Sequence, residues 1–186
     1  MKWVTIVLPL LLASLALTFD LVRVKGRSME PSLCDGDLAL VAARWVPTEG
    51  TSRSPLEKIL VLTQPRSGEL MLKRVVAVGG DRIRIEHGGL VRNEEPVVET
   101  YTCRADYFET WPYGSRPDAQ ENFTVPPGEV FVMGDNRTSS SDSRNFGSVP
   151  MTSVRGIVSI RLPTLHRRPD CSCSAGAQPG AARPKE

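Results

Sequence analysis

The feature that most constrains how this chain can fold is the shortness of its apolar segments between Val22 and Leu162. Almost no segment in this range keeps a helical period for ten residues, and glycine, proline, aspartate and asparagine separate one apolar stretch from the next. Short apolar or alternating stretches bounded by turn-forming residues are typical of β-strands. We therefore predict a mainly β domain with strands at residues 38–43, 59–63, 69–78, 82–86, 97–100, 129–133 and 156–161.

The same pattern predicts how the strands are connected. His87-Gly88-Gly89 separates an alternating stretch from the next apolar one, which indicates a tight hairpin. Residues 102–128 contain several proline and glycine residues and little periodicity, so we predict an irregular insert there. Residues 166–186 are rich in arginine, proline, glycine, alanine and serine, a composition typical of a disordered tail.

Residues 3–19 differ from the rest of the chain because none of these 17 residues is charged. A helix needs about 17 to 25 apolar residues to cross a bilayer, so this run is long enough for a transmembrane anchor. A cleaved secretory signal is the alternative, since Ser14 and Ala16 supply small residues at the spacing that processing requires. Either segment directs residues 20–165 out of the cytosol. We predict a single-pass protein whose domain is on the non-cytoplasmic side, because long domains cross a membrane largely regardless of charge.

The charge balance excludes one class of partner. The chain has 186 residues, enough for one domain with an anchor and a tail. Of its 23 basic and 21 acidic residues, four basic and two acidic ones follow Leu165, so residues 1–165 carry 19 of each. A neutral body has no electrostatic footprint for nucleic acid, and we expect no such partner.

Ser28 and Lys73 are candidate catalytic residues. A serine in a loop such as Gly26-Arg27-Ser28 is ordinarily solvated, and a nucleophile would need a base. The two histidines of the chain are His87, in the predicted hairpin, and His166, in the tail, so a Ser-His-Asp triad is not expected.

Lys73 is the more informative candidate for a base. In the predicted strand 69–78 it shares one face with Met71, Val75 and Ala77, which places its amine among apolar side chains. Burial disfavours the ammonium form and can lower the pKa of a lysine by several units. The alternative is a lysine that extends to water at a strand edge or pairs with a carboxylate.

The cysteines raise two questions, a disulfide pairing and a metal site. Cys34, Cys103, Cys171 and Cys173 allow three disulfide pairings, and the sequence does not choose among them. His166 with Cys171 and Cys173 offers only three ligands at an unusual spacing, so we expect no metal site. No glycine-rich phosphate loop joins a strand to a helix, and we expect no cofactor.

Four motifs, in this order, resemble the type I signal peptidase family, the membrane-anchored Ser-Lys proteases that remove leader peptides from exported preproteins. An apolar N-terminal segment and Ser28-Met29-Glu30-Pro31 are followed by Gly36-Asp37-Leu38-Ala39-Leu40-Val41, by Lys73-Arg74-Val75-Val76-Ala77-Val78-Gly79-Gly80-Asp81, and by Gly134-Asp135-Asn136-Arg137 with residues 139–144. Alone, the last motif is equally a solvated turn rich in Asp, Asn and Ser. The resemblance covers nearly all of residues 3–165.

The resemblance implies the family's β-rich catalytic domain behind one transmembrane helix, with preproteins and membrane lipid as partners. It favours a bacterial cell membrane over an organelle inner membrane and leaves the second open. It implies that Ser28 is the nucleophile and Lys73 the general base of an acyl-enzyme mechanism. Many members add an oxyanion donor two residues before the nucleophile, where this chain has Gly26, so one side-chain donor is missing. Only residues 20–27 separate the apolar run from Ser28, which keeps the nucleophile near the membrane and favours an uncleaved anchor.

The resemblance also assigns five supporting positions. One hydroxyl orients the lysine, one ion pair braces the loop that carries it, and two apolar residues line a pocket for small substrate side chains. In this order they are Ser140, Asp142 with Arg144, and Met29 with Leu72.

Two other functions stay open at this point. A self-cleaving repressor of the Ser-Lys type has a similar core, but it is cytosolic and carries a DNA-binding domain where this chain has an apolar segment. An exported β-rich binding domain, or an inactive relative, is the alternative from another class. In a peptidase the Ser28 hydroxyl and the Lys73 amine should meet within about 3.2 Å, whereas a binding domain has no need of that contact.

Overall fold

The computed structural model describes residues 19–43, 54–65, 67–86, 89–102 and 122–162. All but the last residue of the expected anchor, most of the expected insert and the whole tail lie outside these residues. Within the described ranges, no helix has the length and apolar character needed to span a membrane.

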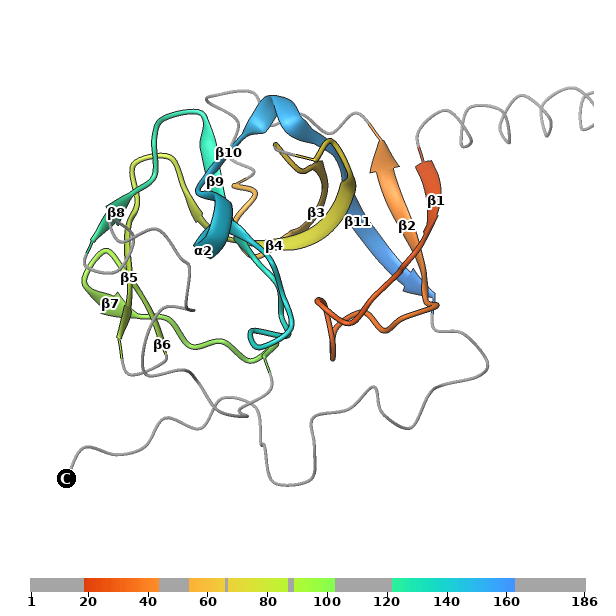
Figure 1. Cartoon of the computed structure of the whole chain (residues 1–186), viewed down its shortest axis with the longest axis horizontal. Helices are drawn as coiled ribbons and strands as arrows, with labels where there is room; N and C mark the ends of the chain where they lie inside the picture. Colours follow the sequence, from red (N-terminus) through yellow and green to blue (C-terminus); the bar gives the residue numbers. More distant parts are fainter. Residues whose placement is uncertain (1–18, 44–53, 66, 87–88, 103–121, 163–186) are drawn as a thin grey trace, which may run out of the picture.

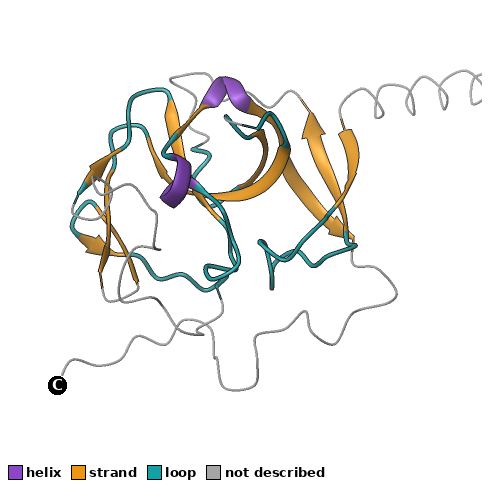
Figure 2. Cartoon of the chain, viewed as in Figure 1, coloured by secondary structure: helices purple, strands orange, loops and turns teal. Residues whose placement is uncertain are grey.

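Two antiparallel sheets make up the described part of the chain (Figures 1 and 2). The larger sheet has the order β1-β2-β11-β3-β4-β9-β10. Its strands are β1 (Phe19–Arg23), β2 (Leu38–Ala43), β3 (Ile59–Thr63), β4 (Leu70–Val78), β9 (Glu129–Met133), β10 (Val149–Pro150) and β11 (Val154–Leu162). The smaller sheet has the order β7-β6-β5-β8, formed by Glu95–Pro96, Gly89–Arg92, Arg82–Glu86 and Phe123–Thr124.

Helical structure is limited to single turns within the described ranges. The α-helix α2 covers Ser143–Phe146, and the 3-10 turn η2 covers Met151–Ser153. The smaller sheet lies at the opposite end of the domain from β1 and β2 (Figure 1). The prediction of a mainly β domain is therefore confirmed.

Most of the predicted strands are confirmed, and one is wrong. Residues 97–100 form no strand: Val97 makes one backbone hydrogen bond to Leu90 (2.8 Å), and a turn begins at Thr100. The Glu99 side chain is buried in an ion pair instead of alternating along a strand. The predicted hairpin is supported by the pairing of Glu86 with Gly89, although its turn residues lie outside the described ones.

Four strands, β1, β7, β8 and β10, are absent from the prediction because their sequence signals are weak, and β6 is predicted only as the second arm of the hairpin. The edge strand β1 has two charged residues, Asp20 and Arg23, among its five, and β7, β8 and β10 have only two residues each. The short strand β8 lies in the last part of the range predicted as an irregular insert, where it pairs with β5.

A bulge in β4 changes which core its residues enter. The partner of Val75 on β9 is Val132 and that of Ala77 is Phe131, so Val76 is an extra residue on β4. An extra residue reverses the alternation of side chains beyond it. Val75 therefore packs in a cluster with Leu60 and Val132, whereas Ala77 packs in a second cluster with Phe131 and Ile83. The prediction that Ala77 shares a face with Val75 and Lys73 is wrong for this reason.

Candidate active site

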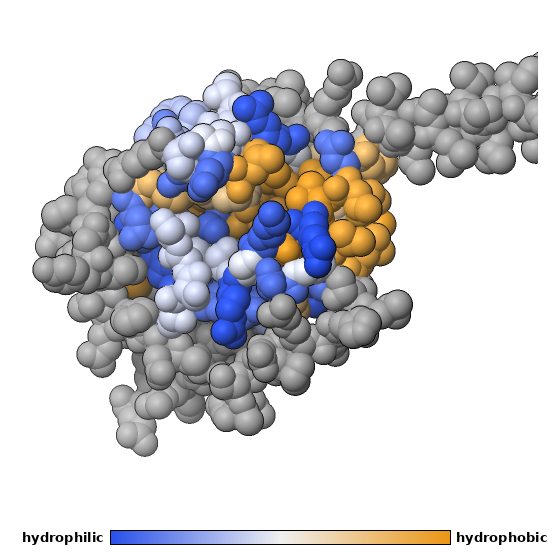
Figure 3. All heavy atoms as spheres, turned by 45° about the vertical axis from the view of Figure 1, so that its right-hand side comes forward, coloured by the Kyte–Doolittle hydropathy of each residue, from blue (hydrophilic) through white to orange (hydrophobic). Residues whose placement is uncertain are grey.

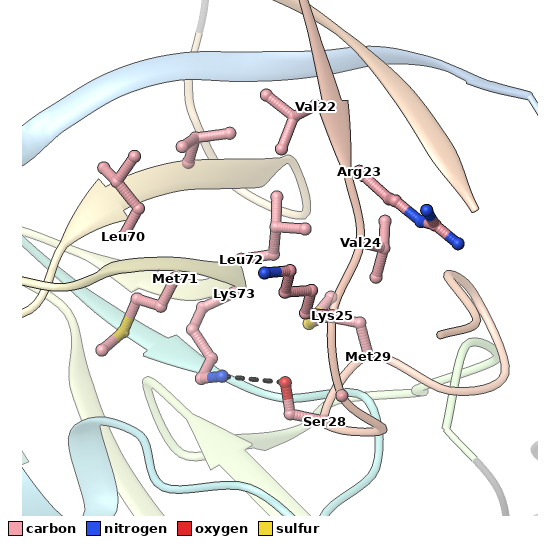
Figure 4. A pocket seen from close by; sticks show the side chains of 12 residues that line it. Val22, Arg23, Val24, Lys25, Ser28, Met29, Leu70, Met71, Leu72 and Lys73 are labelled. Carbon is pink, nitrogen blue, oxygen red and sulfur yellow. Dashed lines mark hydrogen bonds between the residues drawn. The ribbon is translucent and has the colours of Figure 1, made fainter. Parts of the chain in front are cut away.

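Ser28 and Lys73 meet, although 45 residues separate them. Ser28 lies in the turn that follows β1, where the buried side chains of Met29 and Leu33 pack in a third apolar cluster and anchor the turn. Lys73 lies on β4. Its Nζ donates a hydrogen bond of 3.0 Å to Ser28 Oγ (Figure 4). This is a distance at which a proton can pass directly between a hydroxyl and an amine.

The environment of Lys73 favours a neutral amine. The residue is only 4% exposed. Burial lowers its pKa below the ordinary 10.5, and the charge of Arg144 adds to this effect, while the carboxylates of Asp142 and Asp135 oppose it. The net result is a lowered pKa because desolvation is the largest of these influences.

A groove with a volume of about 440 Å³ opens beside the pair. One wall is the chain from Val22 to Gly26, and the other is the first part of β4, from Leu70 to Lys73 (Figure 4). Both residues predicted to line a substrate pocket, Met29 and Leu72, are among its lining residues. The walls are largely apolar, with the hydroxyl of Ser28 and the amine of Lys73 at one end.

Both walls of the groove are open strand edges. β1 is the last strand at its side of the larger sheet. β4 pairs with β9 only from Arg74 onward, so within the described chain residues 70–73 have a strand partner, β3, on one side alone. Unpaired backbone groups on two facing edges can receive an extended peptide between them.

The polar loop after β9, residues 134–142, lies near Lys73, and hydrogen bonds to Asp142 hold it in place. Its carboxylate accepts hydrogen bonds from Gly134 N (2.9 Å) and from Arg144 Nε (2.8 Å) and Nη2 (2.9 Å). It also caps α2, since Arg144 N donates to it and the Asn145 side chain accepts from Asp142 N. Complete burial alone would raise the pKa of Asp142, but these partners outweigh burial and lower it.

Ser140 lies in the same loop with a buried hydroxyl. It is close enough to the Asp142 carboxylate to help lower its pKa. Yet among the described residues its Oγ has no partner in hydrogen-bond geometry. The bond to Lys73 that the sequence led us to expect is therefore not formed in this structure.

Gly134 lies where the loop packs against Ser28. A Cβ atom at this position would lie 2.5 Å from the backbone oxygen of Ser28 and against the Ser140 side chain. Two residues later, Asn136 N donates to the same Ser28 oxygen (3.1 Å). The loop thus packs directly on the backbone of Ser28, and only glycine fits.

Gly26 has a conformational reason to be glycine. Its φ angle is +84°, in the left-handed region, and its N–H donates to Asp35 Oδ1 (2.9 Å). Open space surrounds the position of a Cβ atom. The absence of a side-chain donor here follows from the backbone conformation and not from a lack of room.

Two further ion pairs involve residues of the loop after β9, and sequence analysis assigned them no role. Arg74 pairs with Asp135 through bonds of 2.8 and 2.6 Å, and Arg137 pairs with Glu99 through both of its terminal nitrogens. Arg74, Asp135 and Arg137 all belong to motifs quoted above, which was the available signal. Their partners could not be inferred, because 61 and 38 residues separate the paired positions.

Cys34, six residues after Ser28, is disulfide-bonded. The other three cysteines of the chain, Cys103, Cys171 and Cys173, lie outside the described residues. The pairing therefore stays open, as it was from the sequence.

Comparison with known proteins gives a consistent result. The profile of the family described as "Signal peptidase, peptidase S26" matches residues 1–163. The chain is 33% identical over 156 residues to signal peptidase I U of Bacillus subtilis, with 80% of each chain covered. It is 29% identical over 196 residues to signal peptidase I of Streptococcus pneumoniae, with 87% of this chain and 91% of the relative covered. A crystal structure of a signal peptidase I from Enterococcus faecalis aligns with a TM-score of 0.47 and 26% identity, covering 59% of this chain and all of the other.

Proposed function

The chain belongs to the signal peptidase, peptidase S26, family, and we propose that it removes N-terminal signal peptides from exported preproteins through a Ser28–Lys73 dyad. The observation that carries the proposal is the 3.0 Å hydrogen bond between Lys73 Nζ and Ser28 Oγ at the end of an apolar groove. A serine endopeptidase of this kind needs a nucleophile, a neutral base and room for a peptide.

The chemistry follows from the two side chains. Neutral Lys73 takes the proton of the Ser28 hydroxyl as Oγ attacks the scissile carbonyl, and a tetrahedral intermediate forms. The lysine ammonium then gives its proton to the leaving amine, which departs as the new N-terminus of the mature protein and leaves the signal peptide esterified to Ser28. A water molecule, deprotonated by Lys73, hydrolyses this ester and restores the enzyme.

The developing oxyanion needs a donor in place of the side chain that Gly26 lacks. Among the described residues, the Ser28 N–H donates to no other group. It is therefore free to bind the oxyanion, as backbone N–H groups of nucleophiles do in acyl transfer.

The open edges of β1 and of residues 70–73 suit an extended substrate. A peptide placed between them would form backbone hydrogen bonds to both walls, as in other cases of strand addition. Its side chains would alternate between the apolar lining and solvent, and Met29 and Leu72 would limit the size of the one beside the scissile bond. This arrangement supports a preference for small residues there.

Ser140, Asp142 and Arg144 have supporting roles in this proposal. The Asp142–Arg144 pair holds the loop against the dyad, and a rotation of the Ser140 hydroxyl would let it orient the Lys73 amine. The side chains of the ion pair are almost completely buried, so water does not screen their attraction.

An exposed apolar face supports work at a membrane surface. Leu21 on β1 and Ile160 on β11 both lie opposite Leu40 on β2, and Leu162 continues the row. Leu21, Ile160 and Leu162 are exposed. Figure 3 shows apolar surface gathered at this side of the molecule. We include in the proposal a membrane anchor at residues 3–19, a non-cytoplasmic domain at 20–165, and lipid contact by this face.

A cleavage assay tests the proposal. The full chain in detergent should cut a preprotein after its hydrophobic segment, and Ser28→Ala and Lys73→Ala should each abolish cleavage. Ser141→Ala and Lys58→Ala are matched controls on exposed residues and should retain it. An inert parent, or mutants that cut as well as the parent, would favour the binding-domain alternative.

A further inference from the structure

A buried carboxylate outside the four motifs is tied to the active-site loop. Glu99 follows the smaller sheet and is 5% exposed. Its carboxylate accepts hydrogen bonds from both terminal nitrogens of Arg137 and from the Tyr101 hydroxyl (2.8 Å). Burying a charged carboxylate is costly unless it is fully paired, so this cluster is held in one geometry.

Arg137 connects this cluster to the loop by hydrogen bonds. Its Nε donates to the carbonyl oxygen of Gly134 (3.1 Å), at the start of the loop. Its own carbonyl accepts a hydrogen bond from Arg144 Nη2 (2.7 Å), the guanidinium that pairs with Asp142. One arginine therefore links Glu99 to both ends of the segment that covers Lys73.

The segment held in this way contacts Ser28 and places charged side chains near Lys73. Gly134 packs on the Ser28 backbone, and Asn136 N donates to its oxygen (3.1 Å). Asp142 and Arg144 are close enough to Lys73 to influence its pKa. A small displacement of the loop would alter the position of the hydroxyl and the surroundings of the amine together.

A second connection reaches the lysine from the other side. Arg74, the residue after Lys73, lies with its guanidinium 4.1 Å from the centre of the Tyr101 ring. The same guanidinium binds Asp135 in the loop. Tyr101 thus joins Glu99 to the strand that carries the base, in a cation–π contact.

We infer that Glu99 is a positioning residue for the Ser28–Lys73 dyad, acting through Arg137 on the loop that begins at Gly134. The inference rests on the proposed peptidase function. Glu99 touches neither the groove nor the reacting atoms, so its effect is on the geometry of the dyad and not on substrate binding.

The test is a kinetic comparison of Glu99→Gln with the parent, using the full chain in detergent and one preprotein. We expect kcat to fall about 10- to 100-fold with KM unchanged, because a small misplacement of reacting groups costs rate and not affinity. We also expect the acid limb of the kcat/KM profile to move to higher pH. A looser loop admits water to Lys73, and less desolvation lets the pKa of the amine rise towards 10.5.

Two further variants keep the test decisive. Glu94→Gln is the matched control, since this glutamate is exposed on the smaller sheet, and its kinetics should equal those of the parent. Glu99→Gln alone leaves Arg137 buried and unpaired, so it can fail to fold. In that event the double variant Glu99→Gln/Arg137→Gln, which buries no net charge, replaces it and should show the same lowered kcat and the same pH shift.

The outcomes separate this inference from the function on which it rests. A folded variant with parental kcat and an unchanged acid limb would overturn the positioning role, as would a loss of activity that only follows the loss of folded protein. A parent that does not cleave at all would overturn the proposed function, and this inference with it.

Discussion

Under the proposed mechanism, replacing Gly134 by alanine should slow cleavage by moving the backbone of Ser28. The added Cβ would lie 2.5 Å from the Ser28 backbone oxygen, whereas ordinary contact begins at 3.4 Å. The two groups must therefore separate by 0.9 Å. Of the Ser140 atoms that the Cβ also meets, Oγ can rotate away, but Ser140 Cβ (2.5 Å) and the Ser28 oxygen cannot move without their main chain. Overpacking of this kind costs about 1–3 kcal/mol of stability.

A displacement of this size should reduce kcat by about 10²-fold, as expected for a misplacement of roughly 1 Å in a catalytic geometry. The assay is preprotein cleavage under saturating substrate, with a thermal melt to confirm folding. Gly89→Ala is the control, because a Cβ there meets its nearest atom, the Glu86 oxygen, at an ordinary 3.5 Å. A folded Gly134→Ala enzyme that cleaves at close to the parental rate would refute the claim that this contact fixes the nucleophile.

Three further predictions concern other parts of the site. Lys73→Met should raise thermal stability. The gain should be largest below the lowered pKa of the amine, where the folded parent buries a charge, and should shrink as the pH rises towards 10.5. Thermal melts of both proteins at neutral and alkaline pH measure this difference. Arg144→Met should cost about 3–5 kcal/mol in denaturant unfolding, because it leaves the Asp142 carboxylate buried and unpaired; a much smaller loss would contradict this explanation. Gly26→Ser should lower kcat/KM instead of supplying the missing oxyanion donor, because a serine with φ of +84° strains the backbone by about 1–2 kcal/mol. A faster enzyme would show that the backbone adopts another conformation.

The sequence was sufficient to predict the larger strands, because their signal is local. β2, β3, β5 and β9 have the predicted bounds, and β4 and β11 agree within two residues. What failed depends on long-range packing. Residues 97–100 have the composition of a strand, but Glu99 is drawn inward by an arginine 38 residues away. The bulge at Val76, which directs Ala77 to another core cluster, likewise depends on the pairing with β9 and not on the sequence of β4 alone.

The candidate site shows the same division. Ser28, Lys73 and the Asp142–Arg144 pair lie in motifs with a recognisable order, so they could be named from the sequence, and the structure brings all four together. The partners of Arg74 and Arg137 could not be named, because an ion pair across strands leaves no periodic signal. The orientation of Ser140 also depends on packing, and its hydroxyl is not bonded to Lys73 in this structure.

The most direct test of the central claim is a titration of Lys73 itself in the active enzyme. Lysine labelled with ¹³C at the ε carbon would report the protonation of each amine by NMR, and Lys73→Met would identify the signal. We predict that Lys73 titrates below its ordinary 10.5 and that its midpoint coincides with the acid limb of kcat/KM for preprotein cleavage. A Lys73 that titrates at its ordinary pKa, or an acid limb that does not coincide with its titration, would contradict the assignment of this amine as the base.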